Sequence, residues 1–173
     1  LSNVASAFVG QVEAQMMIRP YLKGMLVVSP FLSGGIVDML SASGFPVSLI
    51  SRDDALDEQH ERLPDDWFPE EGTSVHSFRQ ELSLEGAPLS GLHAKLWVAD
   101  DGWDAHLWVG SANATEAAFT RNVEFLLQLS GARSKMGIDA TIKIPERFTE
   151  YPEVSKADPA AVAAIAKKLA GIV

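Results

Sequence analysis

The segment from His93 to Leu107 alternates polar and apolar residues on both sides of the acidic, glycine-containing stretch Asp100-Asp101-Gly102. Such alternation is typical of strands with one face on a core, and a short acidic turn with glycine is typical of the connection between antiparallel strands. The pattern therefore predicts a β-hairpin. Because residues two apart on a strand share a face, His93 and Lys95 are expected to project to the same side. Asp100 lies an odd number of residues from His93, so we interpret it as structural, closing the turn or pairing locally.

The return arm of this hairpin ends in Val109-Gly110-Ser111-Ala112-Asn113, before a helix that is expected to begin near Thr115. Ser111 and Asn113 share a face in the same way as the pair on the first arm. Small residues and free backbone N–H groups at the junction of a strand and a helix suit a bound anion. The two arms thus place a nucleophile, a cation and hydrogen-bond donors on adjacent strands, a combination that favours cleavage of a phosphodiester.

The order His-x-Lys-x4-Asp followed by Gly-Ser-x-Asn resembles the HKD motif of the phospholipase D superfamily. The matching residues are His93, Lys95, Asp100, Gly110, Ser111 and Asn113. Asn122-Val123-Glu124 also matches the Asn-x-Glu that often follows this motif. The hairpin tip is a few residues longer than the common family pattern, at a position where length varies at little cost. The resemblance covers residues 24 to 130 in the order of elements, and its specific residues lie between His93 and Glu124.

The resemblance implies a phosphodiesterase that needs no metal or other cofactor and acts through a phosphohistidine intermediate. His93 would be the nucleophile or the acid, and Lys95 and Asn113 would hold the non-bridging oxygens of the phosphate. Ser111 would add a donor from its hydroxyl or its backbone. Glu124 would orient His93 through the other ring nitrogen, as carboxylates do for catalytic imidazoles.

This family mechanism uses two histidines from two motifs, whereas the chain holds one motif. The other histidines, His60, His76 and His106, lack a lysine two residues on. The second half would come either from a homodimer partner with twofold symmetry or from a part of the protein outside this sequence. Because the chain starts at Leu1 inside sequence that looks helical, we expect a segment excised from a longer protein.

The substrate is less constrained than the chemistry. The net charge of −9 argues against broad attraction to nucleic acid or anionic lipid, which weakens a nucleic-acid substrate without excluding it. Analogy with related bacterial nucleases and the lack of an evident membrane-docking helix favour nucleic acid. The alternatives are phospholipase or phosphatidyltransferase activity, or a noncatalytic module that uses the phosphate pocket for binding or dimerisation. The absence of cysteine excludes disulfides and does not indicate a compartment. Because no apolar run approaches about 20 residues and no signal peptide precedes the first predicted helix, a cytoplasmic location is expected.

The remaining periodicities predict an α/β fold with a mixed β-sheet flanked by helices on both faces. Helices are expected over residues 3–18, 33–43, 55–63, 115–119 and 158–169, and strands over 25–29, 46–51, 73–78 and 123–129, in addition to the hairpin. Strand, helix and strand in succession imply a parallel crossover. The whole chain is expected to form one domain, with a core over about residues 24–130 and a C-terminal extension over 131–173.

Three more residues are candidates for substrate contacts. Gly110 belongs to the anion-binding junction. Trp97 shares its strand face with His93 and is expected to line the mouth of the site, where it could stack on a base or a lipid headgroup. Arg52 lies at the end of a predicted strand, where α/β sheets gather ligands. The basic stretch from Arg133 to Arg147 could approach a phosphate backbone, although a surface connection is the favoured interpretation.

Overall fold

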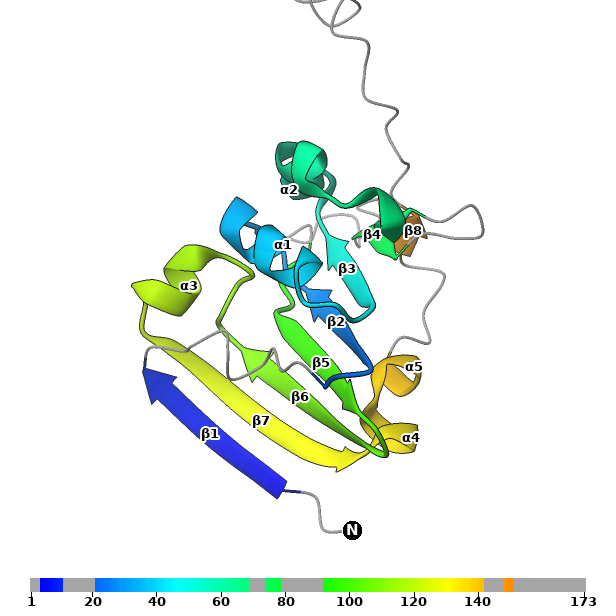
Figure 1. Cartoon of the computed structure of the whole chain (residues 1–173). Coiled ribbons are helices and arrows are strands. Elements are labelled where there is room, and N and C mark those ends of the chain that lie inside the picture. Colours follow the sequence, from blue (N-terminus) through cyan, green and yellow to red (C-terminus); the bar gives the residue numbers. More distant parts are fainter. Residues whose placement is uncertain (1–3, 11–20, 69–73, 79–91, 142–147, 151–173) are drawn as a thin grey trace, which may run out of the picture.

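In the described part of the chain, eight strands form one sheet at the centre of the molecule (Figure 1). The computed structural model describes residues 4–10, 21–68, 74–78, 92–141 and 148–150. The strands are β1 (Val4–Gly10), β2 (Gly24–Val28), β3 (Val47–Ser51), β4 (Val75–Phe78), β5 (Leu96–Asp101), β6 (Asp104–Gly110), β7 (Glu124–Ala132) and β8 (Phe148–Glu150). They lie in the order β1-β7-β6-β5-β2-β3-β4-β8. The sheet therefore extends at both edges beyond the predicted core of residues 24–130.

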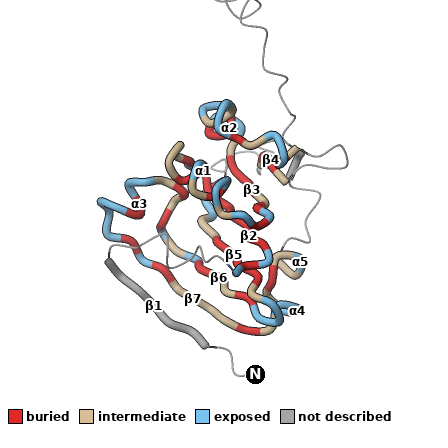
Figure 2. Tube along the Cα trace, viewed as in Figure 1, coloured by how far each residue is buried: buried red, intermediate tan, exposed pale blue. Residues whose placement is uncertain are grey.

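The sheet is mixed, as predicted. β2, β3 and β4 pair in parallel, and every other neighbouring pair is antiparallel. The crossover between β2 and β3 is α1 (Gly34–Ser41), which confirms the predicted strand, helix and strand. β2 is buried along its whole length, consistent with its continuous apolar sequence. Figure 2 shows buried residues concentrated along β2, β3 and the strand beside β2 on its other side, and the buried residues of α1 are Ile36, Val37 and Leu40.

Helices cover both faces of the sheet, as predicted. The helices after α1 are α2 (Asp53–Gln59), α3 (Glu116–Thr120), α4 (Arg133–Met136) and α5 (Ile138–Thr141). α1, α2 and α3 contribute to one hydrophobic cluster, which contains Val37, Leu56, Phe119 and the side chain of Val27. On the opposite face, Ile138 of α5 packs against the second cluster, formed around Leu26, Ile50 and Val98. None of the described helices is long and apolar enough to cross a membrane.

The predicted helix over residues 3–18 is wrong for its first part. Val4–Gly10 is strand β1, which pairs antiparallel with β7 from Val4 opposite Ser130 to Gly10 opposite Glu124. Without β1, β7 would present a long row of unpaired backbone groups at the edge of the sheet, and pairing satisfies them. Residues 11–18 and the predicted helix over 158–169 lie outside the described residues.

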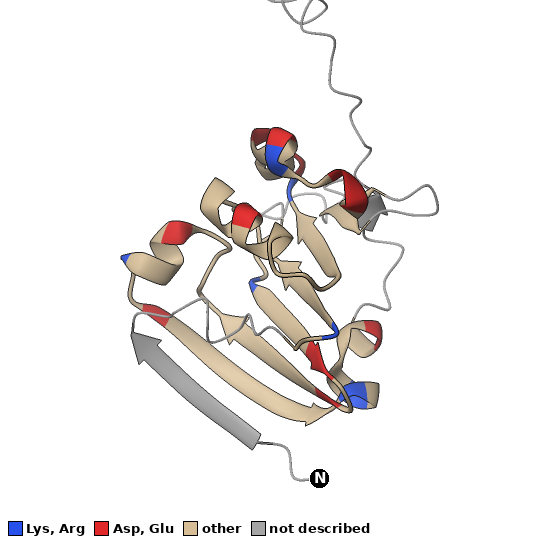
Figure 3. Ribbon diagram, viewed as in Figure 1, with Lys and Arg blue, Asp and Glu red and all other residues tan. Residues whose placement is uncertain are grey.

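The acidic run that begins at Asp53 lies on α2 and on the two 3₁₀ turns that follow it, His60–Arg62 and Asp65–Trp67. Its aspartates and glutamates up to Asp66 are solvent-exposed, and the ribbon in Figure 3 shows acidic residues in red on α2 and on the turns after it. The four tryptophans differ in their exposure to solvent. Trp67, Trp97 and Trp108 are buried, whereas Trp103 at the hairpin tip is 93% exposed.

Candidate active site at one end of the sheet

The strand registers bring one set of strand ends together. Ile50, Val28, Leu96 and Val109 lie side by side on β3, β2, β5 and β6. Residues that follow this row on β2, β3 and β6, or precede it on β5 and β7, lie at the same end, which we name the site end. The opposite end carries the turn between β5 and β6, and we name it the turn end. Gly102 at that turn has a φ of +61°, a conformation that favours glycine.

His93 and Lys95 lie at the site end, immediately before β5. The strand begins at Leu96, so the prediction that both residues are part of it is wrong. The Lys95 carbonyl still accepts a hydrogen bond from Gly110 N at 3.4 Å, and its Nζ donates to the carbonyl of His93 at 3.0 Å. The His93 side chain is exposed and its ring makes no hydrogen bond to another described residue. The imidazole is therefore open to a ligand.

Ser111 and Glu124 form the most connected part of the site end. Ser111 Oγ donates to Glu124 Oε2 and accepts from Phe125 N at 2.9 Å, while Ser111 N donates to the Phe125 carbonyl at 3.0 Å. Asn122 Nδ2 donates to Glu124 Oε1 at 3.1 Å. Glu124 is only 6% exposed. Its described partners are thus Ser111 and Asn122, and it makes no hydrogen bond to the ring of His93 here.

Gly110 has a packing role in this arrangement. A Cβ added to it would lie 1.9 Å from the carbonyl oxygen of Phe125 on β7. No side chain can occupy that position unless the two backbones separate. The glycine therefore allows β6 and β7 to approach closely where the Ser111 hydrogen bonds form.

Asn113 lies between β6 and α3, and its Oδ1 is buried without a hydrogen-bond partner among the described residues. Because the oxygen and nitrogen of an amide exchange places by a flip, the same position can present an NH₂ group to an anion. The next residue is held firmly, because Ala114 N donates to Ser29 Oγ at 2.9 Å and the Ala114 carbonyl accepts from Ser33 N at 3.0 Å. Ser51 Oγ in turn donates to the Ser29 carbonyl at 2.7 Å.

Sequence reasoning missed this serine tether, which consists of Ser29, Ser33 and Ser51. Ser29 and Ser51 are both fully buried at the ends of neighbouring strands. A small hydroxyl residue directly after a buried apolar run was the available signal, since such residues satisfy backbone groups where parallel strands end. The tether fixes the segment that carries Asn113 against the end of β2.

Arg52 also lies at the site end, directly after β3. Its guanidinium pairs with Asp54 and lies over the ring of Phe31, with Cζ 5.2 Å from the ring centroid. Trp97, by contrast, does not line the mouth of the site. It is 1% exposed and packs edge to face on Phe119 of α3, with 5.4 Å between ring centroids. The expected strand face was the one that α3 covers.

Asp100 lies at the turn end, near the opposite end of β5 from His93. The residue is 3% exposed, and its carboxylate contacts Arg133 Nε at 2.9 Å and accepts a hydrogen bond from Ile138 N at 3.2 Å. Four residues of strand separate it from Leu96, about 13 Å at 3.3 Å per residue, and His93 lies beyond Leu96 at the other end of β5. Asp100 therefore anchors α4 and α5 to β5 and is remote from the site end.

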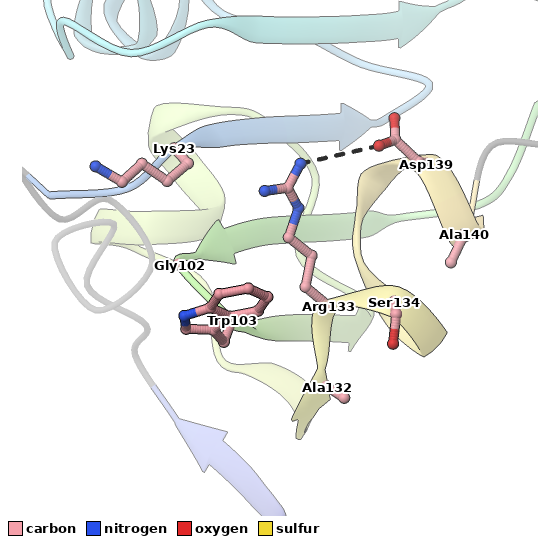
Figure 4. Close-up of a pocket in the computed structure, with 8 residues that line it drawn as sticks. All are labelled: Lys23, Gly102, Trp103, Ala132, Arg133, Ser134, Asp139 and Ala140. Carbon is pink, nitrogen blue, oxygen red and sulfur yellow. Dashed lines mark ion pairs between the residues drawn. The ribbon is translucent and has the colours of Figure 1, made fainter.

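A pocket of about 970 Å³ lies at the turn end as well (Figure 4). It is lined by Lys23, Gly102, Trp103, Ala132, Arg133, Ser134, Asp139 and Ala140. Figure 4 shows the Arg133 guanidinium directed towards Asp139, and the two groups are 3.9 Å apart. None of the predicted site residues lines this pocket. No group of three or more histidine, aspartate or glutamate side chains in the described part of the chain is placed to hold a metal ion.

Comparison with known proteins gives matches among solved structures. No family model matches the sequence, and no curated protein does. Nuc from Salmonella typhimurium, a phospholipase D family member, superposes with a TM-score of 0.53 at 15% identity, over 86% of this chain and 99% of Nuc. The phosphatidylserine synthase of Haemophilus influenzae Rd KW20 superposes with a TM-score of 0.56 at 13% identity, over 98% of this chain and 46% of the synthase. The chain thus spans nearly all of one of these proteins and about half of the other, and it has the fold of the phospholipase D superfamily.

Proposed function

We propose that this chain is a metal-independent phosphodiesterase half-site that acts on nucleic acid through a phosphohistidine intermediate. One observation carries the proposal: within a phospholipase D-like fold, the exposed His93 lies at the same end of the sheet as Lys95, Ser111, Asn113 and Glu124. A nucleophile, a cation and neutral donors at one end are the groups that cleavage of an anionic ester requires.

In the first step a ring nitrogen of His93 attacks phosphorus, and the bond from phosphorus to the leaving oxygen breaks. A second histidine, from another copy or a companion half, gives its proton to that oxygen. In the second step the same histidine takes a proton from water, whose oxygen attacks phosphorus, and the bond from phosphorus to nitrogen breaks. The products are a phosphate monoester, an alcohol and regenerated His93.

Lys95 and Asn113 would hold the non-bridging oxygens during both steps. The ammonium of Lys95 has three donors, and the His93 carbonyl uses one of them in the resting chain. Two remain for a phosphate without breaking that contact. Asn113 brings an amide that has an unsatisfied buried oxygen and gains a partner when a ligand arrives.

Glu124 would have two tasks. It holds Ser111 and Asn122 by hydrogen bonds in the resting chain. A carboxylate has about four acceptor sites, so it retains the capacity to accept from the ring of His93 once substrate binds. This second task follows from the family resemblance.

The proposed location of the enzyme is the cytoplasm.

The test is hydrolysis of bis(p-nitrophenyl) phosphate in EDTA by the wild type and by His93→Ala, with the molar mass of both measured by light scattering. We expect turnover that survives EDTA and is lost in the variant, from a dimer or from a longer chain that carries the companion half. Loss of turnover on chelation with rescue by magnesium would contradict the mechanism. Equal turnover in His93→Ala would contradict the site.

A second candidate is action on phospholipids, which the apolar surroundings of Glu124 favour. Val123, Phe125 and Val109 are 74%, 46% and 39% exposed at the site end. Exposed apolar side chains next to a site favour a lipid or protein partner. Release of headgroup from phosphatidylcholine vesicles, without cleavage of an oligonucleotide, would establish this candidate. Phosphodiester binding without turnover, kept in His93→Ala and lost in Lys95→Ala, would indicate a noncatalytic module.

A further inference from the structure

We propose that Phe31, with the Arg52 guanidinium behind its ring, is a stacking shelf for an unpaired nucleobase next to the scissile phosphate. The inference rests on the proposed function and narrows its substrate to nucleic acid with single-stranded character. Two features carry it: the exposed aromatic surface of Phe31, and the hydrogen bonds that hold this residue at the site end.

Phe31 is held in place by the serine tether. Ser29 Oγ donates to the Phe31 carbonyl at 2.7 Å and accepts from Ala114 N. The following residue, Leu32, forms a bridge with Ala114, which is the neighbour of Asn113. Phe31 is therefore fixed between the end of β2 and the segment that carries a proposed phosphate ligand.

The shelf is close to the proposed nucleophile in the plane of the sheet. β5, which begins after His93 and Lys95, lies next to β2, and β3 with Arg52 is one strand farther. Neighbouring strands are about 4.8 Å apart, so the ends of β2 and β3 lie roughly 5 and 10 Å from the start of β5. This spacing suits a base adjacent to the phosphate that His93 would attack.

The exposure of Phe31 leaves aromatic surface for a ligand even with Arg52 over the ring. The guanidinium of Arg52 lies over the ring, yet Phe31 remains 48% exposed. A single exposed apolar ring is common on a protein surface, so the support for a ligand comes from the fixed place of Phe31 at the site end and not from its exposure alone. Planar stacking on a fixed aromatic ring is how proteins bind the bases of single strands without reading their sequence.

The charge of Arg52 supports a base in preference to a second phosphate. Its guanidinium is already paired with Asp54, and Asp53 is exposed beside it. A phosphate would meet this acidic pair, whereas a neutral base would meet only the ring. The guanidinium then serves to orient Phe31, because a planar cation over one face restricts the rotation of the side chain.

The test compares two substrates of equal length and charge, an oligothymidylate and an abasic oligomer with the same sugar-phosphate backbone. The readout is the ratio of kcat/KM on the first to kcat/KM on the second. Stacking of one base is worth a factor of about 5 to 150, so we expect this ratio to fall by that range in Phe31→Leu. Phe31→Tyr should keep the wild-type ratio, and Arg52→Gln should lower it less than Phe31→Leu does.

Trp103→Leu is the matched control, because Trp103 is an exposed aromatic at the turn end. Its ratio should equal that of the wild type. An equal fall in Phe31→Leu and Trp103→Leu would overturn the shelf in favour of general adhesion to aromatic surface. An unchanged ratio in Phe31→Leu, with cleavage that still depends on His93, would overturn the shelf and leave the proposed function intact.

Affinity measurements test the stacking role of Phe31 separately from the proposed cleavage activity. If the wild type, as a dimer or as a longer chain that carries the companion half, cleaves neither oligomer, the proposed function fails, and the same ratio is taken from dissociation constants measured by fluorescence anisotropy. A lower affinity ratio in Phe31→Leu alone would still support the shelf. Loss of binding to phosphatidylcholine vesicles in Phe31→Leu, with oligonucleotide binding unchanged, would assign the ring to a lipid and overturn the inference.

Discussion

The two ends of the sheet differ in how far the polar side chains of the segment from His93 to Asn113 are paired. At the turn end, Asp100 is buried against Arg133 and the amide of Ile138, and Arg133 also approaches Asp139. At the site end, His93 is exposed, and the Asn113 amide has an unpaired buried oxygen. One continuous motif therefore contributes a satisfied structural anchor to one end and unsatisfied polar groups to the other.

The comparison shows why the size of a pocket is a poor guide to chemistry in this chain. The pocket of about 970 Å³ lies at the turn end, where the Arg133 charge is already neutralised by two carboxylates. None of the predicted site residues lines that pocket. The site end, in contrast, carries groups whose hydrogen-bonding capacity is unused. Unused capacity, rather than empty volume, distinguishes the end where a ligand gains most.

The largest expected effect is on activity at the site end. His93→Ala should lower kcat/KM for bis(p-nitrophenyl) phosphate by at least about 10³-fold, because the nucleophile is removed. Since His93 is exposed, the free energy of unfolding should change by less than about 0.5 kcal/mol. The control is His106→Gln. His106 lies on β6, and its ring contacts Ser130 Oγ at 2.8 Å. A comparable loss of activity in the control would remove the distinction between the two ends.

The next effect is on stability and compares two glycines. Gly110→Ala should lower the free energy of unfolding by about 3 kcal/mol or more, since the new Cβ meets a backbone oxygen that cannot move freely. Gly102→Ala at the turn end meets open space and has only its positive φ to oppose it, which costs about 1 kcal/mol. Urea unfolding measures both. Equal values would mean that β6 and β7 separate easily.

Asp100→Asn tests the anchor at the turn end. The change weakens a buried contact with Arg133, so we expect a loss of about 2 kcal/mol in the free energy of unfolding. Turnover at 25 °C should stay within about twofold, because the residue is remote from His93. Asp139→Asn, at an exposed carboxylate, should cost less than about 0.5 kcal/mol. A large fall in turnover for a folded Asp100→Asn would give Asp100 a part in the chemistry.

Ser111→Ala is expected to lower stability less than Asp100→Asn and turnover less than His93→Ala. It removes the hydroxyl that donates to Glu124 and accepts from Phe125 N, which should cost about 1 kcal/mol of stability. Turnover should fall by about tenfold as the Glu124 carboxylate loses one of its two anchors. Ser134→Ala at the turn end is the control for loss of an exposed hydroxyl. If the Ser111 variant matches that control in both measurements, the hydrogen-bond group around Glu124 has no role in the site.

Local patterns predicted much of the central fold. The apolar run of β2, the amphipathic α1 and the β5–β6 hairpin are visible in short windows of sequence, because each depends on residues near one another in the chain. β1 was predicted as helix because Val4 and Phe8 fit a helical stripe as well as a strand. Only the three-dimensional sheet reveals that the edge of β7 needs a partner, so a local pattern could not decide between the two.

For the candidate site, spacing along the chain predicted which residues gather, but not what surrounds them. His93, Lys95, Ser111, Asn113 and Glu124 all lie at the site end. Strand parity assigned Trp97 to a face without showing that Phe119 of α3 covers that face. Nor could the sequence reveal that the partner of Asp100 is Arg133, which lies 33 residues farther along the chain. Contacts between distant segments carry this information.

The division of the tryptophans gives the protein an optical readout of its own. Three of the four indoles are buried and would emit at short wavelength, whereas Trp103 is almost fully in water and would emit at long wavelength. Iodide in solution should quench Trp103 selectively while the core remains protected. In Trp103→Phe the remaining emission would come from the core alone, so its red shift would follow unfolding directly without an added dye.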